Sequence, residues 1–526
     1  MRTPRWILVA IIAGYGLLCG RAAGYDFVWD DVPEIARAEA FDGPLLDALR
    51  MTQVERIDPA LAHTQGVVLA YDSYRPLLVA SYWLEVHAWG RRPGPMHVDN
   101  LVLGAIGIVL AYALARRLVA PPLALAAVAI FALHPIHVEA VVYISGRGDL
   151  LAGVLALAAA LAAVRAIEAG PRGRRIAWTA AAGLGFALSL LAKEACIGLP
   201  VALVALGWAL GARPRHAVIA GVLAAVAVAV VSLRAAVIAT SSNLAVGAAV
   251  ARLPAIGLAY LRGVLLPLDL STDRPLDPAY VVPGWIVAGG VIVAVAVAVV
   301  RRGWPARLAP GLAGLVWWAA LVAPSGVAIL ATGVVSDRYL YAPLLGLAIA
   351  LVAAAAAIVR ARPALRRPVV PAALVWGALI GFVAWQQVAV WRDEPTLEVH
   401  AVAAAPGSGA AHWRLGTMYA QAGQWNEAIA ELRIAAELEP ANHHALDNLG
   451  VALLRQGRNA EAAEVLARAV AACPAPSSFR PLYNLGVARL ALGDRAGGCA
   501  ALRRAVAIRP DYGAAADELA RSCPAR

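Results

Sequence analysis

The sequence predicts an all-α protein with two parts, a polytopic membrane helix bundle of about eleven spans and an α-solenoid of helical repeats. Of the 526 residues, 61% are hydrophobic and only 15% are charged, whereas soluble domains carry about 25% charged residues. Apolar runs of spanning length recur up to Trp391, and beyond it the chain is polar and periodic. We therefore place a membrane domain at residues 1–395 and a repeat domain at 408–526.

A spanning helix requires roughly 20 mainly apolar residues. Runs that approach this length lie at 6–23, 98–115, 119–136, 150–166, 177–193, 196–211, 217–239, 284–300, 309–330, 340–359 and 369–391. The segment 253–268 is apolar but short and contains Arg262, so an interfacial or re-entrant helix is expected and a span is left open. The first run could be a cleaved signal peptide or a lipoprotein signal ending at Cys19, but Leu18 fits the latter poorly, and we favour a retained anchor.

The distribution of arginine predicts the orientation of these spans. Cytoplasmic loops are enriched in Lys and Arg. Arg2 and Arg5 precede the first span, and arginines then fill every second loop, at 116–117, 172–175, 213–215, 301–307 and 360–367. An odd number of spans places the N-terminus in the cytoplasm and the repeats outside. Abundant Ala, Arg and Gly with one lysine indicate a GC-rich bacterial genome, hence an inner membrane with periplasmic repeats.

The net charge of +11 does not indicate a nucleic-acid partner. The arginines lie in short loops between apolar runs, where they orient helices, and form no basic face interleaved with aromatic residues. We therefore expect the lipid bilayer, rather than nucleic acid, to be the partner of this charge.

The C-terminal part repeats with a period near that of tetratricopeptide repeats, about 34 residues. Three sets of small or helix-breaking residues recur, Gly416/Gly450/Gly486, Ala435/Ala469/Ala505 and Pro440/Pro474/Pro510. The small residues allow the two helices of each repeat to approach closely, and the proline ends the second helix. About three repeats with a capping helix at 511–522 are expected, with a concave face that binds protein or peptide.

The five cysteines show no metal-ligand spacing such as CxxC. Cys19 and Cys196 lie in apolar segments. Cys499 falls on the second helix of the third repeat and Cys523 on the adjacent capping helix, so we predict a disulfide between them in an oxidising compartment, with Cys473 a poorer partner.

Charged residues at the ends of spans are expensive and indicate function. Asp30 and Asp31 follow the first span beside aromatic residues and could supply a general base, although a solvated loop or helix cap is the alternative. Two histidines and a glutamate lie at the end of the third run and just beyond it, His134, His137 and Glu139. Pro135 separates the histidines and no third ligand follows at metal spacing, so no metal site is predicted, although a divalent metal stays open.

A second set of charged residues is expected on the same external side. It comprises Arg147, Asp149, Lys193, Glu194, Arg234, Asp337 and Arg338, with Tyr339 beside them. Lys193 is the single lysine of the chain, which indicates a need for a compact ammonium, although a Lys–Glu ion pair at a helix end would also explain it. These residues would place carboxylates that remove protons and cations that bind phosphate at one leaflet. Such a combination suits transfer of a group from a lipid-phosphate donor to an external hydroxyl.

These stretches carry a family resemblance. They run in order along nearly the whole chain, at 27–31, 74–77, 134–141, 145–147, 149–150, 193–194, 337–341 and in the repeats. The chain resembles the transmembrane and tetratricopeptide-repeat (TMTC) proteins and their bacterial relatives, within the C-type glycosyltransferase superfamily that includes the protein O-mannosyltransferases. Asp337 departs from the glutamate expected there, and the repeat array is short for the animal members, which puts the type of acceptor in doubt.

The resemblance implies a polyprenyl- or dolichyl-phosphate sugar as donor, a hydroxyl of protein or glycan as acceptor, and an acidic base in the first external loop. Asp30 would be that base and Asp31 its partner. By this resemblance, five basic residues are candidates for contacts to the donor phosphate or to the acceptor. They are Arg75, Arg147, Lys193, Arg234 and Arg338.

We therefore expect an inverting membrane glycosyltransferase that moves a hexose such as mannose and needs no cofactor that the sequence identifies. Two alternatives remain. A membrane scaffold without activity would use only the repeats. An O-antigen ligase or polymerase also transfers from a lipid carrier, but it places its basic residues in a large late periplasmic loop, and the corresponding loop here, around 336–341, is short.

Overall fold

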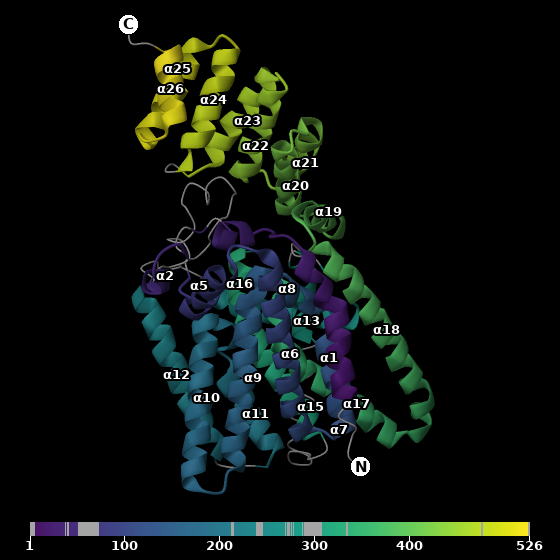
Figure 1. Cartoon of the computed structure of the whole chain (residues 1–526). Helices are drawn as coiled ribbons and strands as arrows, with labels where there is room; N and C mark the ends of the chain where they lie inside the picture. Colours follow the sequence, from purple (N-terminus) through teal and green to yellow (C-terminus); the bar gives the residue numbers. More distant parts are fainter. Residues whose placement is uncertain are drawn as a thin grey trace. The chain divides into compact units, whose positions relative to one another are not determined.

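The computed structural model of the chain describes residues 6–36, 38, 41–50, 73–211, 215–237, 246–268, 270, 274, 276, 278–286, 288, 308–332, 335–474 and 477–523. These residues form helices and connecting turns and contain no strand. The chain divides into two compact units, a membrane unit that ends at Glu394 and a repeat unit that begins at Pro395 (Figure 1).

Seven helices in the described part of the membrane unit are long and apolar enough to cross a bilayer. They are α1 (Trp6–Cys19) with its extension η1 (Gly20–Gly24), α6 (Pro93–Leu118), α9 (Arg147–Glu168), α10 (Arg172–Ala192), α12 (Arg215–Val237), α17 (Pro343–Ala361) and α18 (Arg366–Val390), the last preceded by η9 (Pro363–Leu365). They coincide with the spans predicted at 6–23, 98–115, 150–166, 177–193, 217–239, 340–359 and 369–391. The chain is therefore a multi-pass membrane protein.

The run predicted at 119–136 is not one straight helix. α7 (Pro121–Leu133) stops at His134, whose ψ of 133° is extended, and the chain continues through η4 (Pro135–His137) into α8 (Val138–Val142) at a bend of 52°. Pro135 explains the break, because proline disfavours helical geometry in the residue before it. The pair counts as one broken span or as a re-entrant segment.

Two other predicted spans are shorter than a membrane-spanning helix. The run at 196–211 contains α11 (Leu199–Ala209), after which Gly211 adopts a φ of 71°. The run at 309–330 is divided into α15 (Ala309–Val322) and α16 (Ser325–Thr332), and Pro324 lies in the break because it cannot donate the helical hydrogen bond. By length and composition, the described residues therefore contain seven of the predicted spans as single helices, or eight if the broken pair at 121–142 is one span.

Some expectations fall outside the described residues. These are most of the span at 284–300, the arginine loop at 301–307, and Arg2 and Arg5. The segment expected at 253–268 belongs to a longer helix, α13 (Val246–Leu265), which is not among the seven apolar helices.

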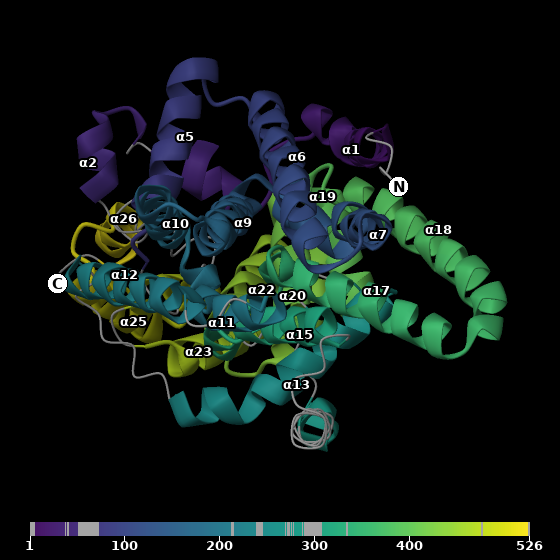
Figure 2. The same cartoon turned by 90° about the horizontal axis from the view of Figure 1, so that it is seen from below.

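Glycine and alanine allow the membrane helices to pack closely. α9 lies beside α10, and α15 beside α17 (Figure 2). At the second contact Gly314 and Gly346 face each other, and a β-carbon on either would overlap the other's carbonyl oxygen. This backbone contact requires glycine at both positions.

Shorter elements complete the described membrane unit. They are η2 (Val32–Ala36), α2 (Leu45–Arg50), α5 (Pro76–Trp89), η5 (Ile144–Gly146), η6 (Glu194–Cys196), η7 (Pro278–Tyr280) and η8 (Asp337–Leu340). Most of them lie between the long helices.

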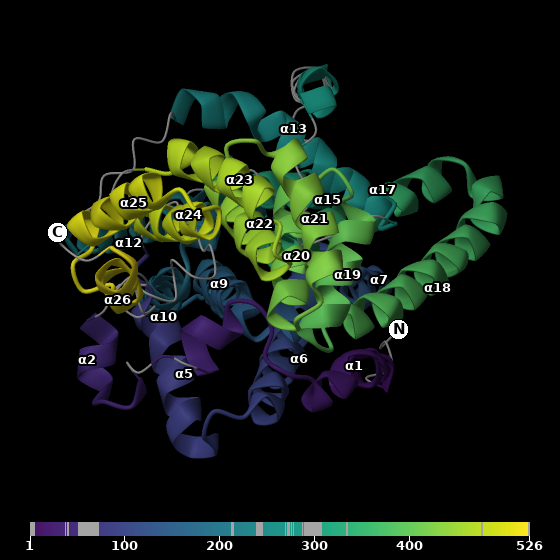
Figure 3. The same cartoon turned by 90° about the horizontal axis from the view of Figure 1, so that it is seen from above.

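The repeat unit is a stack of helix pairs (Figure 3). Its helices are α19 (Glu394–Ala404), α20 (Gly409–Gln421), α21 (Trp425–Leu438), α22 (His443–Arg455), α23 (Asn459–Ala472), α24 (Phe479–Ala491), α25 (Arg495–Ile508) and α26 (Gly513–Ser522). A β-carbon at Gly416, Gly450 or Gly486 would overlap a leucine of the paired helix, as the close-approach argument predicts. The capping helix is present as α26, and the predicted disulfide Cys499–Cys523 is confirmed.

Candidate functional site

The acidic loop after η1 holds its two aspartates in different environments. Asp31 is fully buried. Its Oδ1 accepts hydrogen bonds from the backbone N–H (2.8 Å) and hydroxyl (2.6 Å) of Ser145, and its Oδ2 accepts one from Val28 N–H (3.2 Å). Burial raises the pKa of Asp31 to about 7, although these hydrogen bonds act in the opposite direction. Asp31 therefore ties the loop to η5.

Asp30 is only partly buried and lies on the turn immediately before this anchor. A general base must be able to reach the hydroxyl that it deprotonates. Of the two predicted catalytic aspartates, Asp30 is the one whose side chain has access. Asp31 is better described as a residue that positions the loop.

Arg147, at the start of α9, is fixed inside the protein. Its Nε donates to Asn100 Oδ1 (2.6 Å), its Nη2 donates to the Met96 carbonyl (3.0 Å), and its Nη1 pairs with Glu85 (2.5 Å). The guanidinium also lies over the ring of Tyr82 at 5.0 Å. With 1% of its surface exposed, Arg147 is enclosed by these partners and can stabilise the start of α9.

A chain of alternating charges joins four motif segments, at 134–141, 149–150, 193–194 and 337–341. Lys193 Nζ lies 2.6 Å from Asp149 Oδ2, and Asp149 also faces Arg338 Nε at 3.5 Å. Arg338 Nη1 in turn lies 2.5 Å from Glu139 Oε1, whose other oxygen accepts the backbone N–H groups of Asp337 and Arg338. α8, α9, the end of α10 and η8 are thereby joined.

Tyr339 completes this chain of charges. Its ring lies 5.0 Å from Lys193 Nζ and 5.4 Å from the Arg338 guanidinium. Such distances suit cation–π interactions. The ring therefore contacts both Lys193 and Arg338, and each of these cations is also paired with a carboxylate.

Glu194 binds two arginines on the other side of Lys193. Arg75 Nη2 lies 2.9 Å from Glu194 Oε1, and Arg234 Nη1 lies 2.8 Å from Oε2. Burial would raise the pKa of Glu194, but the two guanidiniums outweigh it and hold the pKa well below its usual range. The Lys193–Glu194 dipeptide does not form an ion pair with itself, and each residue binds partners on other elements.

His134 and His137 are held in the core rather than arranged as ligands. His134 Nε2 lies 2.9 Å from the Val264 carbonyl, and the His137 ring packs on Phe131 (4.6 Å) and Tyr341 (4.9 Å). No group of three His, Cys, Asp or Glu side chains in the described residues is placed to hold a metal ion. In this structure both rings are therefore enclosed by the core of the membrane unit.

Three residues of the site were not predicted from the sequence. Glu85 pairs with Arg147, and Arg274 Nη2 donates to Asp337 Oδ1 at 3.0 Å. Tyr143 packs between the acidic loop and Arg338. A lone carboxylate in the apolar helix α5 is the signal that could have identified Glu85, whereas nothing local marks the other two.

The site residues gather at one end of the helix bundle. They lie at the start of α9, α5 and η8 and near the end of α10 and α12, and antiparallel neighbours bring such ends together. The far ends of α6 and α9 carry a separate ion pair, Arg117–Glu168. The charged motif residues therefore lie together at this end of the bundle, and we call this group the charged layer. Asp31 ties the acidic loop to it.

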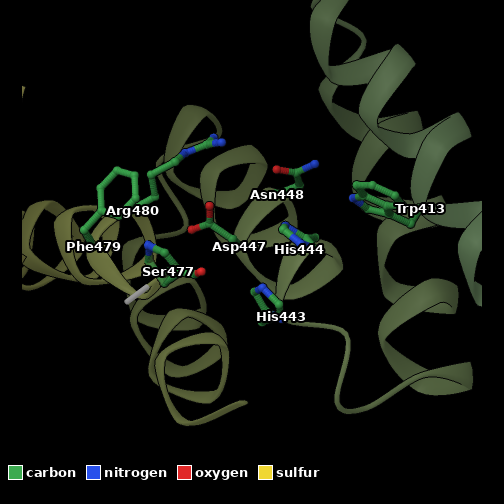
Figure 4. Close-up of a pocket in the computed structure, with 9 residues that line it drawn as sticks. Trp413, His443, His444, Asp447, Asn448, Ser477, Phe479 and Arg480 are labelled. Atoms are coloured by element: carbon green, nitrogen blue, oxygen red, sulfur yellow. The ribbon is translucent and has the colours of Figure 1, made fainter. Parts of the chain in front are cut away.

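The repeat unit has a pocket of its own (Figure 4). It is lined by Trp413, His443, His444, Asp447, Asn448, Ser477, Phe479, Arg480 and Pro481. Asp447 is 5% exposed and accepts a hydrogen bond from Asn484 at 2.7 Å, and burial raises its pKa. The buried Trp413 Nε1 has no hydrogen-bond partner in the described residues. The pocket thus offers a donor, a carboxylate and aromatic surface.

Comparison with known families agrees with this division. The family model of dolichyl-phosphate-mannose-protein mannosyltransferases matches residues 91–239, which include His134 to Arg234 of the site, and tetratricopeptide-repeat models match 414–476 and 482–512. The fold and these matches define a multi-pass membrane protein with a tetratricopeptide-repeat solenoid.

Curated relatives are more specific. Protein O-mannosyl-transferase TMTC1 of Mus musculus is 34% identical over 189 residues, covering 34% of this chain and 19% of the relative. Tmtc1 of Drosophila melanogaster is 40% identical over 93 residues, covering 18% and 11%. The chain is therefore similar to the TMTC proteins over these stretches, which span about a fifth or less of each one's length.

Two solved structures are also similar. The oligosaccharyltransferase of Archaeoglobus fulgidus, tethered with an acceptor peptide, matches at 15% identity and a TM-score of 0.41 over 81% of this chain and 59% of its own. ArnT from Cupriavidus metallidurans, bound to undecaprenyl phosphate, matches at 14% identity and a TM-score of 0.31 over 95% and 79%. These scores are too low to support an argument about the site.

Proposed function

We propose that the membrane unit is a C-type glycosyltransferase that moves a hexose, such as mannose, from a polyprenyl-phosphate donor to a hydroxyl of a protein or glycan acceptor. One observation carries the proposal. Motif residues as far apart as Asp31 and Arg338 belong to one charged layer, with the more accessible Asp30 beside it. A carboxylate with access and several cations at one end of the bundle are what this reaction requires.

In the proposed reaction, Asp30 accepts the proton of the acceptor hydroxyl as its oxygen attacks the anomeric carbon. The bond from that carbon to the donor phosphate oxygen breaks, and the lipid phosphate leaves with the electron pair. Attack opposite to the leaving group inverts the configuration. A general base of this kind contributes about 10²–10⁴ in rate.

Lys193 and Arg338 are our leading candidates for the phosphate contacts. An ammonium has three N–H donors, and the Asp149 contact uses one of them. Among the paired cations of the charged layer, Arg338 has the most exposed side chain, at 20%. Its guanidinium is 5.9 Å from Tyr143 of the loop-facing segment. Arg75 and Arg234 both bind Glu194, and their two positive charges keep its carboxylate ionised.

The proposed location is a bacterial inner membrane, with a cytoplasmic N-terminus and the charged layer and repeats on the periplasmic side. Arginine-rich loops support the orientation. The disulfide Cys499–Cys523 supports an oxidising compartment for the repeat unit.

An acceptor polypeptide is proposed to bind the repeat unit at the pocket around Asp447. Arg480 and Asp447 offset each other's charge there, so an uncharged polar segment suits the pocket better than a strongly acidic or basic one.

The test is sugar transfer by the purified protein in lipid nanodiscs, with radiolabelled polyprenyl-phosphate mannose and a membrane extract as acceptor source. We expect Asp30→Asn to reduce transfer by roughly 10²–10⁴ with unchanged expression. Asp26→Asn is the matched control, because Asp26 is an exposed carboxylate in the same loop. Full transfer by Asp30→Asn would place the base on another residue, with Asp31 the next candidate. Absence of transfer by the wild type would favour the membrane scaffold, whose only function is recruitment by the repeats.

A further inference from the structure

The turn that carries Asp30 contains an unusual backbone conformation. Trp29 has a φ of 50° and is the one residue other than glycine with a positive φ in the described part of the chain. Asp31 N–H donates to the Val28 carbonyl (3.0 Å) and Val32 N–H to the Trp29 carbonyl (3.1 Å), so Trp29 and Asp30 are the two central residues of the first turn. For a bulky residue this φ is strained, and such strain clusters at functional sites.

Glycine would adopt this conformation without strain, and the chain uses 46 glycines elsewhere. A tryptophan at this position therefore has to be explained by its side chain. Its ring lies edge-on to Tyr143, with centroids 6.2 Å apart, and to Trp391, at 5.9 Å. Tyr143 and Trp391 stack on each other at 4.9 Å. We call these three residues the aromatic clamp.

The aromatic clamp joins the turn to the fixed parts of the membrane unit. Tyr143 precedes η5, and Trp391 follows α18; both are 1% exposed. Aromatic pairs of this geometry stabilise contacts beyond simple burial. The clamp can therefore hold Trp29 in a backbone conformation that it would otherwise leave.

Asp30 consequently lies between two anchored neighbours. Trp29 is held by its ring, Asp31 is held by three hydrogen bonds, and the Asp30 side chain between them stays partly exposed. With both flanking residues fixed, the backbone of the turn sets the direction in which the Asp30 side chain leaves the chain. This is how a loop residue can be kept in a defined place for proton transfer.

We propose that Trp29 is a positioning residue, whose ring, held by Tyr143 and Trp391, keeps the strained turn that points Asp30 at the acceptor hydroxyl. This inference rests on the proposed function, in which Asp30 is the base. Trp29 itself does not need to touch the donor or the acceptor.

The test compares Trp29→Ala and Trp29→Phe in the transfer assay. A misplacement of about 1 Å can lower a rate roughly 10²-fold, so we expect Trp29→Ala to lower kcat by roughly that factor with little change in the KM for the donor. Trp29→Phe, which keeps an aromatic ring, should restore most of kcat. Trp178→Ala is the control, because Trp178 is a half-buried aromatic residue of α10 that contacts Arg165 instead.

A second measurement does not depend on catalysis. In Asp30→Cys protein the new thiol reports on the turn, because the three cysteines outside the disulfide are buried. We expect a maleimide to label it several-fold faster when Trp29→Ala is added. An unchanged labelling rate, or a kcat of Trp29→Ala equal to that of the wild type, would overturn the positioning role. Absence of transfer by the wild type itself would instead refute the proposed function, and the labelling rate would still decide whether Trp29 holds the turn.

Discussion

Replacing Lys193 separates a phosphate-binding lysine from one that only forms an ion pair. Its ammonium lies 2.6 Å from Asp149 and its side chain is 12% exposed. Lys193→Met removes this charge and leaves Asp149, whose side chain is 3% exposed, with Arg338 at 3.5 Å. Breaking a buried pair costs about 3–5 kcal/mol. Because Arg338 remains, we expect the lower end, about 3 kcal/mol.

Lys193→Arg keeps the charge but changes its shape. The Lys193 side chain is only 12% exposed and its ammonium is bound to Asp149, so the wider guanidinium has to fit a largely enclosed site and should cost about 1 kcal/mol. If the ammonium binds donor phosphate, transfer should fall roughly 10²-fold, as when one donor to developing charge is removed. Stability in this variant should therefore change little while transfer changes strongly.

The assay pairs thermal unfolding in detergent with sugar transfer from the radiolabelled donor. Arg165→Lys is the control, a conservative exchange of a cation that lies 5.0 Å from the Trp178 ring. Full transfer by Lys193→Arg, with lost stability alone in Lys193→Met, would refute the phosphate role and leave a plain ion pair.

Three further predictions concern other parts of the chain. Burial raises the pKa of Asp31 from 3.8 to about 7, so the folded protein binds the proton of this carboxyl more tightly than the unfolded chain does. The protonated carboxyl therefore contributes to the free energy of unfolding at low pH. This contribution, on the order of 4 kcal/mol, is lost as the pH rises from about 4 through 7. Thermal unfolding from pH 4 to 8 should accordingly be flatter for Asp31→Asn than for wild type, and parallel curves would contradict this. Cys499→Ser opens a disulfide across 24 residues and should cost about 3 kcal/mol, seen as a lower unfolding temperature of the repeat unit; an unchanged temperature would argue against a stabilising bridge. Export-dependent reporter fusions should be active after Trp391 and silent at Gly170, and the reverse pattern would overturn the orientation.

The overall fold was predictable because its signals are local. Hydropathy located the seven long helices, and the spacing of Gly416, Gly450 and Gly486 gave the repeats and, through them, the Cys499–Cys523 pair. The errors have local causes too. Hydropathy does not register the breaks at Pro135 and Pro324, because proline is uncharged and an apolar window runs through it.

The sequence predicted that the charged motif residues lie together, but it identified neither Glu85, Arg274 and Tyr143 nor the partner of each charge. Sequence motifs placed the charged residues on one side, and the structure brings them into one layer. Which carboxylate binds which cation depends on tertiary packing. The sequence does not distinguish Asp30 from Asp31, whose burial differs in the structure. Likewise, it does not show that the guanidinium of Arg147 is bound by Asn100 and Glu85.

Mass spectrometry of envelope proteins and glycans from a deletion strain tests the central claim most directly. We expect the deletion to remove one hexose from at least one acceptor, wild-type protein to restore it, and Asp30→Asn protein, expressed equally, not to restore it. Restoration by Asp30→Asn, or an unchanged set of glycans in the deletion strain, would contradict the proposal that this charged layer transfers sugar.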